Sequence, residues 1–225
     1  QLRTAHGPRG SGAGEYWNDE PWLDLDNTYS GLAVFQESLD TLLRQPARPA
    51  FYIEGYYESE NNVTEQQLRE QIYVPLLVGA MGHVFGNSPM WRFGSGWANA
   101  LGSRGARDVE QAWRLFSARR WYTLVPDHPR SFVVSGFGST TDPRAVGAAA
   151  ADGDFALVYV VGTSAFAVDL RELAGAVTAR WYDPTNGTFR TVAGSPFPND
   201  RTLTVSAPGT NATGTADWVL VLEAL

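Results

Sequence analysis

The chain has 225 residues and a net charge of −7, and 44% of its residues are hydrophobic, which suffices for one large or two modest packed domains. The acidic balance argues against a nucleic-acid-binding surface, which requires clustered Lys and Arg. The absence of cysteine excludes disulfides, thiolate nucleophiles and cysteine-based metal sites.

Short strands and helices alternate in the first part of the chain. Residues 2–6 predict a strand, and a glycine-rich loop follows it. The apolar and acidic alternation in 22–26 predicts a second strand, and apolar residues at helical spacing predict a helix over 32–43. The apolar run 50–53 predicts a strand that is buried on both faces and ends on Glu54.

The same alternation continues after this strand. A capping box at Thr64 predicts a helix that extends through Leu77. Residues 82–85 predict another strand, and residues 106–119 predict a helix with an apolar face that includes Trp113. Alternation of this kind indicates a parallel sheet, either an open doubly wound sheet or part of a (β/α)8 barrel.

Two prolines in residues 126–129 predict a domain boundary, with one domain over 1–125 and a second over 126–225. Beyond it the helical spacing disappears, and turn signals such as Asn186-Gly187 separate short strand candidates. This pattern predicts an antiparallel β-sandwich. The strand candidates are residues 131–134, 145–149, 155–161, 165–170, 177–182, 188–192, 202–206 and 218–222.

Few residue types remain that could carry chemistry. The histidines His6, His83 and His128 are isolated, and no His-Glu-x-x-His sequence occurs, so we expect no metal. No Gly-x-Ser-x-Gly frame and no nucleotide-binding glycine loop is present, so we expect no cofactor. Carboxylates and aromatic residues at strand ends remain, and glycoside hydrolysis requires this combination.

Several separated motifs lie at these strand ends. They are residues 15–30, residues 53–58 (Ile-Glu-Gly-Tyr-Tyr-Glu) and residues 82–87 (Gly-His-Val-Phe-Gly-Asn) with Trp91. In this order they resemble the later half of the apiosidase-like glycoside hydrolase barrels. The tail, with Trp-Tyr-Asp-Pro at 181–184 and residues 217–223, is similar to the β-domain that follows those barrels and is often labelled a collagen-binding domain.

The resemblance implies an α/β plus all-β fold, in which the C-terminal half of a (β/α)8 barrel, strands five to eight, precedes a β-sandwich. It implies that Glu54, at the end of strand seven, is the nucleophile of a retaining glycoside hydrolase. It also implies that the acid/base carboxylate lies on strand four, in a missing N-terminal segment. Because half a barrel leaves strand edges unpaired, we expect the N-terminal half as a partner, in the same chain or as a cleaved fragment.

Other residues near the strand ends are expected to bind the carbohydrate, and some have simpler alternatives. Glu58 is either a partner of Glu54 or a surface group, and Tyr57 either forms a hydrogen bond with the nucleophile or, as is more usual for a single tyrosine, fills the barrel mouth. His83 is otherwise a satisfied core histidine, and Asn87 otherwise stabilises a turn. The residues expected to bind the substrate are His6, Tyr57, Glu58, His83, Asn87 and Trp91.

Trp91 lies in a loop without an amphipathic pattern, so we expect it to form a sugar platform rather than part of the core. Asp24 and Asp26 could bind sugar hydroxyls or pair with arginines, and we favour the pairing. We expect Trp181 and Trp218 to lie in the core of the β-domain.

The function expected from these observations is a retaining glycoside hydrolase that acts on a plant or microbial polysaccharide or oligosaccharide. We expect it outside the cell, as a secreted, periplasmic or cell-surface protein, with no nucleic-acid or membrane partner. The alternative is a non-catalytic carbohydrate-binding, collagen-binding or structural module.

Overall fold

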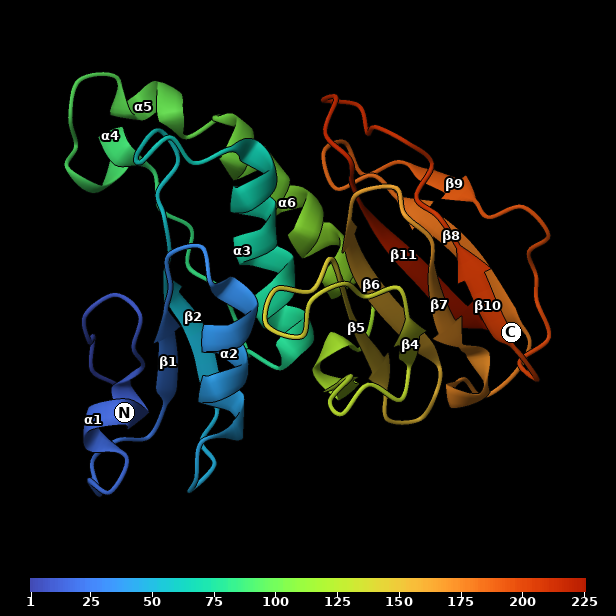
Figure 1. Cartoon of the computed structure of the whole chain (residues 1–225). Coiled ribbons are helices and arrows are strands. Elements are labelled where there is room, and N and C mark those ends of the chain that lie inside the picture. The colour runs from blue at the N-terminus through green and yellow to red at the C-terminus, as the bar shows by residue number, and fades with distance from the viewer. The chain divides into compact units, whose positions relative to one another are not determined.

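The computed structural model describes residues 1–225, which form two compact units, residues 1–110 and 111–225 (Figure 1). None of the helices is both long and apolar enough to cross a membrane. The elements of the first unit are α1 (Ala13–Trp17), β1 (Asp26–Tyr29), α2 (Val34–Leu43), β2 (Ala50–Glu54), α3 (Glu65–Val78), α4 (Ser88–Trp91) and α5 (Trp97–Ala100). Helix α6 (Arg104–Ser117) contains the boundary between the two units.

The first unit contains four extended segments that lie side by side in chain order. In the centre, β1 and β2 pair in parallel, with Asp26 opposite Ala50. Before β1, the carbonyl oxygen of Arg3 accepts hydrogen bonds from the backbone N–H groups of Asp24 and Leu25, at 3.0 and 3.1 Å. Beyond β2, residues 81–84 pair with Tyr52, which forms a parallel bridge with His83. The parallel arrangement matches the alternating sequence pattern.

Three of the predicted strands differ in the structure: two are not regular strands, and one begins later than predicted. Residues 2–6 and 82–85 are extended but form only isolated backbone contacts, so neither is a regular strand. The strand predicted at 22–26 begins only at Asp26. The reason is that the N–H of Leu23 closes a turn onto the carbonyl of Glu20, and the next two N–H groups share one acceptor instead of forming a ladder.

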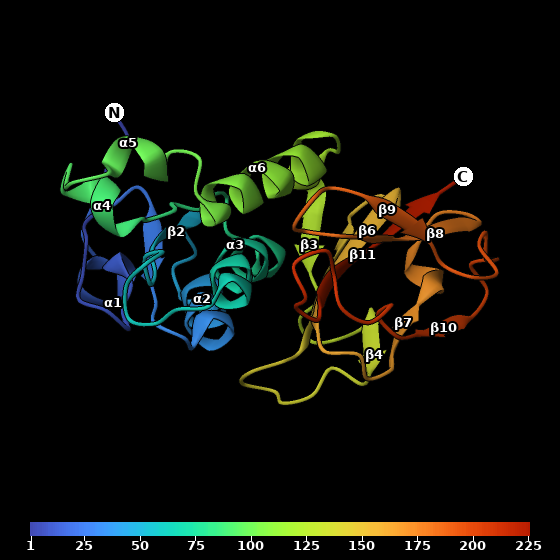
Figure 2. The same ribbon diagram turned by 90° about the horizontal axis from the view of Figure 1, so that it is seen from above.

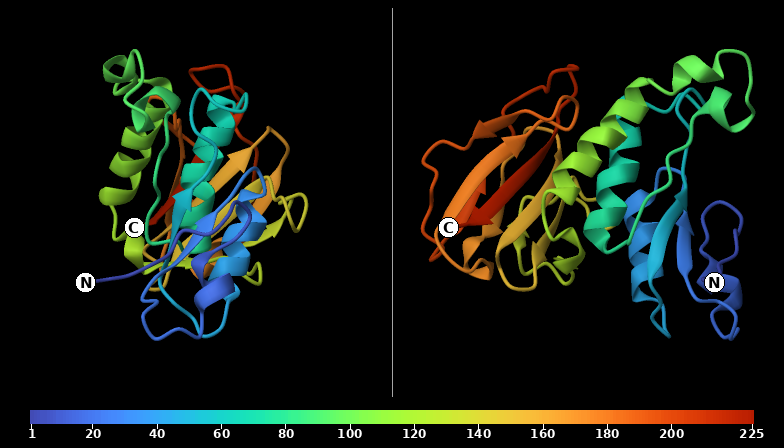
Figure 3. Two further views of the ribbon diagram at one scale, coloured as in Figure 1. Left: turned by 90° about the vertical axis from the view of Figure 1, so that its left-hand side faces the viewer. Right: turned by 180° about the vertical axis from the view of Figure 1, so that it is seen from behind.

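Helices α2 and α3 pack together, and α2 also packs against β1 and β2 (Figure 3). The capping box at the start of α3 is confirmed, because the Thr64 hydroxyl accepts from Gln67 N at 3.2 Å and the Gln67 side chain accepts from Thr64 N at 2.9 Å. Leu68 and Ile72 of α3 are buried in the core.

The helix predicted over 106–119 is α6, and its buried stripe differs from the prediction. Ala112 and Phe116 are buried, but Trp113 is exposed. The stripe instead begins at Asp108, four residues before Ala112, and Trp113 lies about 100° around the helix from Ala112. The prediction placed Trp113 on the buried face of α6, but the buried face contains the carboxylate of Asp108 instead.

Asp108 is fully buried with Arg69 of α3, and their side chains approach to 2.7 Å. Arg104, one turn earlier on α6, approaches the other carboxylate oxygen to 2.7 Å. Burial raises the pKa of Asp108, and the two arginines oppose this effect. The pair fixes the first turns of α6 against α3.

The second unit contains two antiparallel sheets around one core (Figure 2). One has the order β3-β5-β6-β11-β8-β9, and the other has the order β10-β7-β4. Its elements are η1 (Trp121–Thr123), β3 (Leu124–Pro126), β4 (Val133–Ser135), β5 (Ala145–Ala150), β6 (Phe155–Val161), β7 (Phe166–Asp169), η2 (Leu170–Glu172), β8 (Val177–Tyr182), β9 (Phe189–Thr191), β10 (Thr202–Val205) and β11 (Asp217–Ala224).

The eight strand candidates correspond to β4 through β11, because short apolar runs between glycine turns are strong local signals. The expectation for Trp181 and Trp218 is confirmed, since both are buried in the core between the sheets. The turn signal at Asn186-Gly187 lies in the β8–β9 hairpin, and Gly187 has a φ of +76°. Strand β3 was missed because it ends on Pro126, which is tolerated at a sheet edge.

Replacing Asp108 with alanine should destabilise the chain strongly, because it leaves the buried Arg69 guanidinium without its carboxylate. We expect a loss of about 3–5 kcal/mol in the free energy of unfolding, measured by urea denaturation. The matched control is Asp24→Ala, which removes a solvent-exposed pair with Arg3 and should leave stability nearly unchanged. Similar losses in both variants would contradict the assignment.

Candidate functional site

Glu54 is the last residue of β2, at the carboxyl end of the parallel segments, and its side chain is 23% exposed. The chain turns directly after it at Gly55. A Cβ atom at Gly55 would collide with Gln71 Oε1 and the Tyr52 hydroxyl, so any larger residue there requires these side chains to move. The buried Gln71 side chain accepts from Tyr56 N at 2.6 Å and donates to Tyr56 O at 3.2 Å. The turn directly after Glu54 is thus held by both polar atoms of the Gln71 side chain.

His6 forms a hydrogen bond with Glu54 across 48 residues of sequence. Its Nε2 lies 2.6 Å from Glu54 Oε2, and its Nδ1 lies 2.9 Å from the carbonyl oxygen of Gly7. Both ring nitrogens of His6 are thus engaged by protein oxygens, which fixes the orientation of the imidazole beside Glu54.

Tyr57 also lies close to Glu54. Burial raises the pKa of Tyr57, and the nearby Glu54 carboxylate raises it further. Glu54 therefore contacts two polar side chains, one from the N-terminal segment and one from the loop after β2. These contacts orient its carboxylate.

Trp91, in α4, lies beside Tyr57, with ring centroids 6.4 Å apart in an edge-to-face arrangement. Its side chain is 56% exposed, and its Nε1 donates to Glu60 Oε1 at 3.1 Å. This hydrogen bond is the main reason why the pKa of Glu60 is lowered. The indole is thus held at its polar edge while its faces stay partly accessible. His6, Glu54, Tyr57 and Trp91 together are called the Glu54 cluster.

The other predicted site residues form different contacts. Glu58 Oε2 accepts from Asn87 Nδ2 at 2.7 Å, and Glu58 Oε1 accepts from Gly105 N at 2.9 Å. Glu58 therefore links the residue before α4 to the first turn of α6. His83 stacks on Tyr52 with ring centroids 5.7 Å apart, and burial lowers its pKa to about 4, so that it is neutral at pH 7.

Three residues beside the Glu54 cluster were not predicted. The guanidinium of Arg9 lies 4.7 Å from the ring centre of Tyr56 and 5.5 Å from that of Tyr29. The Tyr29 ring also meets the edge of His6 at 4.9 Å. Tyr29 ends β1, so a correct placement of that strand would have identified it. No pattern in the sequence marks Arg9, which lies in the glycine-rich loop.

The two aspartates behave as expected. Asp24 accepts hydrogen bonds from the backbone N and Nε of Arg3, and the Arg3 contact lowers the pKa of Asp24. Asp26 is buried and pairs with Arg44 at 3.1 Å. Both are thus structural. No group of three or more potential ligands could hold a metal ion.

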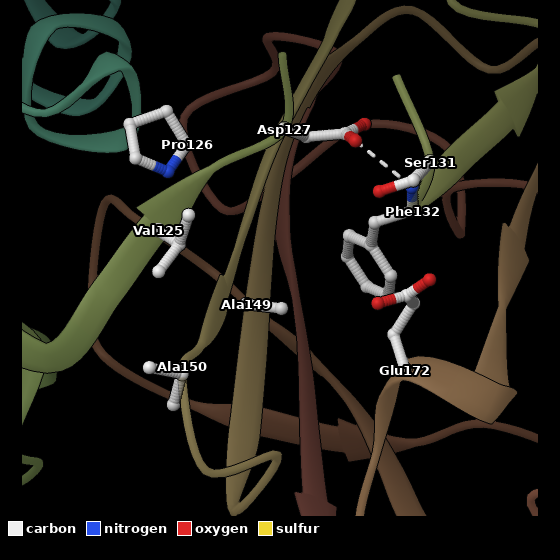
Figure 4. A pocket seen from close by; sticks show the side chains of 9 residues that line it. Val125, Pro126, Asp127, Ser131, Phe132, Ala149, Ala150 and Glu172 are labelled. Atoms are coloured by element: carbon white, nitrogen blue, oxygen red, sulfur yellow. Dashed lines mark hydrogen bonds between the residues drawn. The ribbon is translucent and has the colours of Figure 1, made fainter. Parts of the chain in front are cut away.

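A pocket in the second unit has a volume of about 220 Å³ and includes two carboxylates, Asp127 and Glu172 (Figure 4). The Asp127 oxygens accept from the backbone N of Phe132 at 2.8 Å and of Val133 at 2.7 Å. Asp127 therefore closes a turn, and Glu172 is the one carboxylate left to face a ligand. The pocket lacks the pair of available carboxylates that glycoside hydrolysis requires.

The sequence matches two family models. The first describes an apiosidase-like catalytic domain and covers residues 1–123, and the second describes a putative collagen-binding domain of a collagenase and covers residues 125–223. No curated protein matches the sequence significantly.

Two solved structures resemble the whole chain. One is a glycoside hydrolase, and the other is a glycoside hydrolase family 5 protein from Bacteroides vulgatus ATCC 8482. Each has a TM-score of 0.81 and 19% identity, over 100% of this chain and 57% and 56% of theirs, respectively. The chain therefore shares their fold and spans little more than half of their length.

Replacing Glu54 with glutamine should lower the pKa of Tyr57, because the variant loses the negative charge that disfavours the tyrosinate. The measurement is ultraviolet difference titration of tyrosine ionisation. A Tyr57→Phe variant identifies which part of the titration belongs to this residue. An unchanged titration of Tyr57 in the glutamine variant would show that the two side chains are not in contact.

Proposed function

Since this chain belongs to the apiosidase-like family, we propose that it is the C-terminal half of a retaining glycoside hydrolase barrel, followed by a β-sandwich domain. The substrate is a plant or microbial polysaccharide or oligosaccharide, and the protein acts outside the cell. Neither nucleic acid nor a membrane is a partner. The main support is the position of Glu54, a carboxylate at the carboxyl end of a central parallel strand beside aromatic side chains.

The half-barrel proposal is supported by the arrangement of the first unit. Its four extended segments follow one another in chain order, as strands five to eight of a barrel do. The outer segments, 2–6 and 81–84, leave edges that further strands would pair. The resembling structures are almost twice as long as this chain. The missing strands one to four belong to a preceding segment, in the same chain or as a cleaved fragment.

In this proposal Glu54 attacks the anomeric carbon and forms a covalent glycosyl intermediate. The acid/base carboxylate lies about 5 Å away on the missing strand four, protonates the leaving oxygen, and then activates water. A nucleophile and an acid/base on separate segments are consistent with the contacts of the first unit. Glu58 and Glu60, the carboxylates nearest to Glu54 in the sequence, both accept hydrogen bonds from protein donors. In this proposal the second carboxylate is therefore supplied by the missing segment.

The remaining members of the Glu54 cluster have supporting roles. His6 and Tyr57 lie against the Glu54 carboxylate and orient it. Trp91 offers an aromatic face to the C–H face of a sugar. His83, Asn87 and Glu58 shape the adjoining loops and bind sugar hydroxyls where these loops meet the substrate.

The Glu54→Gln variant of the complete protein should lose turnover by roughly 10³-fold or more, because the amide cannot act as a nucleophile. The activity is measured on a panel of plant and microbial polysaccharides. In addition, a 2-fluoro-glycoside that traps the covalent intermediate should label the Glu54 peptide, detected by mass spectrometry. Glu60→Gln, a change of the same kind nearby, should keep most of the activity. Normal turnover in the Glu54 variant would exclude the assignment.

A non-catalytic role is the second candidate, because residues 125–223 match the domain described as collagen-binding. In that case the chain binds fibrous collagen or a polysaccharide without cleaving it. Co-sedimentation of the complete protein with collagen fibrils and with insoluble polysaccharide distinguishes the two ligands. Binding without any turnover, together with no label at Glu54, would favour this role over the hydrolase.

A further inference from the structure

The segment 88–104 carries three aromatic side chains and contributes none of them to the core. Helices α4 and α5 lie in it, and none of its residues is buried. One of the three is Trp91 of the Glu54 cluster, and the other two, Phe93 and Trp97, are 72% and 37% exposed. Groups of exposed, large apolar side chains are uncommon on soluble proteins and usually mark a binding surface. We call Phe93 and Trp97 the aromatic pair.

The backbone at Phe93 adopts a conformation that is unfavourable for a bulky residue. Its φ is +50°, in the left-handed region, where a Cβ atom crowds the backbone. Two turns hold this conformation, since Phe93 N donates to Met90 O at 3.1 Å and Gly94 N donates to Pro89 O at 2.9 Å. Glycine would fit the position without strain, but the chain carries an exposed phenylalanine there. Strain that yields no buried contact indicates a role in function.

The two rings of the aromatic pair are arranged so that flat faces stay available. Their centroids are 5.4 Å apart and their planes meet at 81°, which is an edge-to-face contact. In such a contact one ring uses only its edge, so both of its faces remain free of its partner. An aromatic face of this kind is suited to the C–H face of a sugar ring.

The aromatic pair lies at the same end of the parallel segments as Glu54. The loop that carries it starts beside the loop that follows Glu54, because Asn87 forms a parallel bridge with Glu58. Helix α5, which begins at Trp97, contacts α4, which ends on Trp91 (Figure 1). The aromatic pair therefore extends the aromatic surface of the Glu54 cluster along this loop.

We propose that the aromatic pair binds a further sugar residue of the glycan, beyond the sugar that contacts Trp91. The exposure of the two rings and the strain at Phe93 stand without any activity, whereas the saccharide nature of the ligand rests on the proposed glycosidase function. With two aromatic sites in one loop, the protein recognises a run of sugar residues and prefers an oligosaccharide to a single sugar.

Binding of oligosaccharides to the complete protein tests this proposal, in the Glu54→Gln background so that the probes are not consumed. The probes are the cello-, xylo-, manno- and galacto-oligosaccharide series, each as the monosaccharide and the hexasaccharide. Binding is followed by the indole N–H signals in nuclear magnetic resonance, and Trp97→Phe identifies the signal of Trp97. In at least one series we expect the hexasaccharide to shift this signal and to bind about tenfold more tightly than the monosaccharide.

Phe93→Gly is the decisive variant, because glycine relieves the backbone strain and removes the ring. We expect the affinity for the hexasaccharide to fall about fivefold, while the midpoint of urea unfolding stays equal or rises. Leu101→Ala is the matched control, because Leu101 is 60% exposed in the same segment but has no aromatic face. This control should keep the affinity of the parent protein.

Other results overturn the proposal. Equal hexasaccharide affinity in Phe93→Gly and the parent, equal losses in Phe93→Gly and Leu101→Ala, or no hexasaccharide binding in any series excludes the sugar site. A lower unfolding midpoint in Phe93→Gly shows that another part of the complete protein covers the pair. A dimer of the parent that Phe93→Gly dissociates, measured by sedimentation, assigns the pair to a second copy. Cleavage products in the Glu54→Gln background contradict the hydrolase assignment alone, so the two proposals fail separately.

Discussion

The parallel backbone pairing on both edges of β2 is the constraint on which the candidate site depends. It places Glu54 at a fixed point, since β1 and residues 81–84 hold the strand from either side. The Gln71 clamp on Tyr56 then fixes the direction of the turn that follows. A carboxylate on such a support can be oriented by only a few further contacts, and His6 and Tyr57 provide them. The rigid strand and the polar neighbours together make Glu54 suited to precise chemistry.

The two units differ in the kinds of contact that they bury. The second unit buries a continuous apolar core between two sheets, with Trp181 and Trp218 inside. The first unit also has an apolar core, which includes Leu68 and Ile72, but it buries more polar contacts, such as Arg69 with Asp108 and Asp26 with Arg44. Buried ion pairs depend strongly on geometry, so they specify one arrangement of the segments that carry Glu54. The candidate carboxylate, Glu54, therefore lies in the more polar of the two units.

Features with strong local signals could be predicted from the sequence. These include the capping box at Thr64, the apolar strand that ends on Glu54, and the short strands of the second unit. Features set by tertiary contacts could not be predicted. The start of β1 at Asp26 depends on backbone hydrogen bonds to Arg3, and the exposure of Trp113 depends on the buried stripe being defined by Asp108. The contact of His6 with Glu54 joins residues 48 positions apart, which no local pattern reveals.

The Gln71 side chain fills the space where a Cβ atom at position 55 would lie. A larger residue at position 55 therefore displaces Gln71 unless residue 71 becomes shorter at the same time, and a shorter residue 71 alone would release the loop at Tyr56. The two positions are thus epistatic, and either change alone passes through an unfavourable intermediate. Evolution of the inner rim of this site is expected to proceed by paired substitutions rather than single steps.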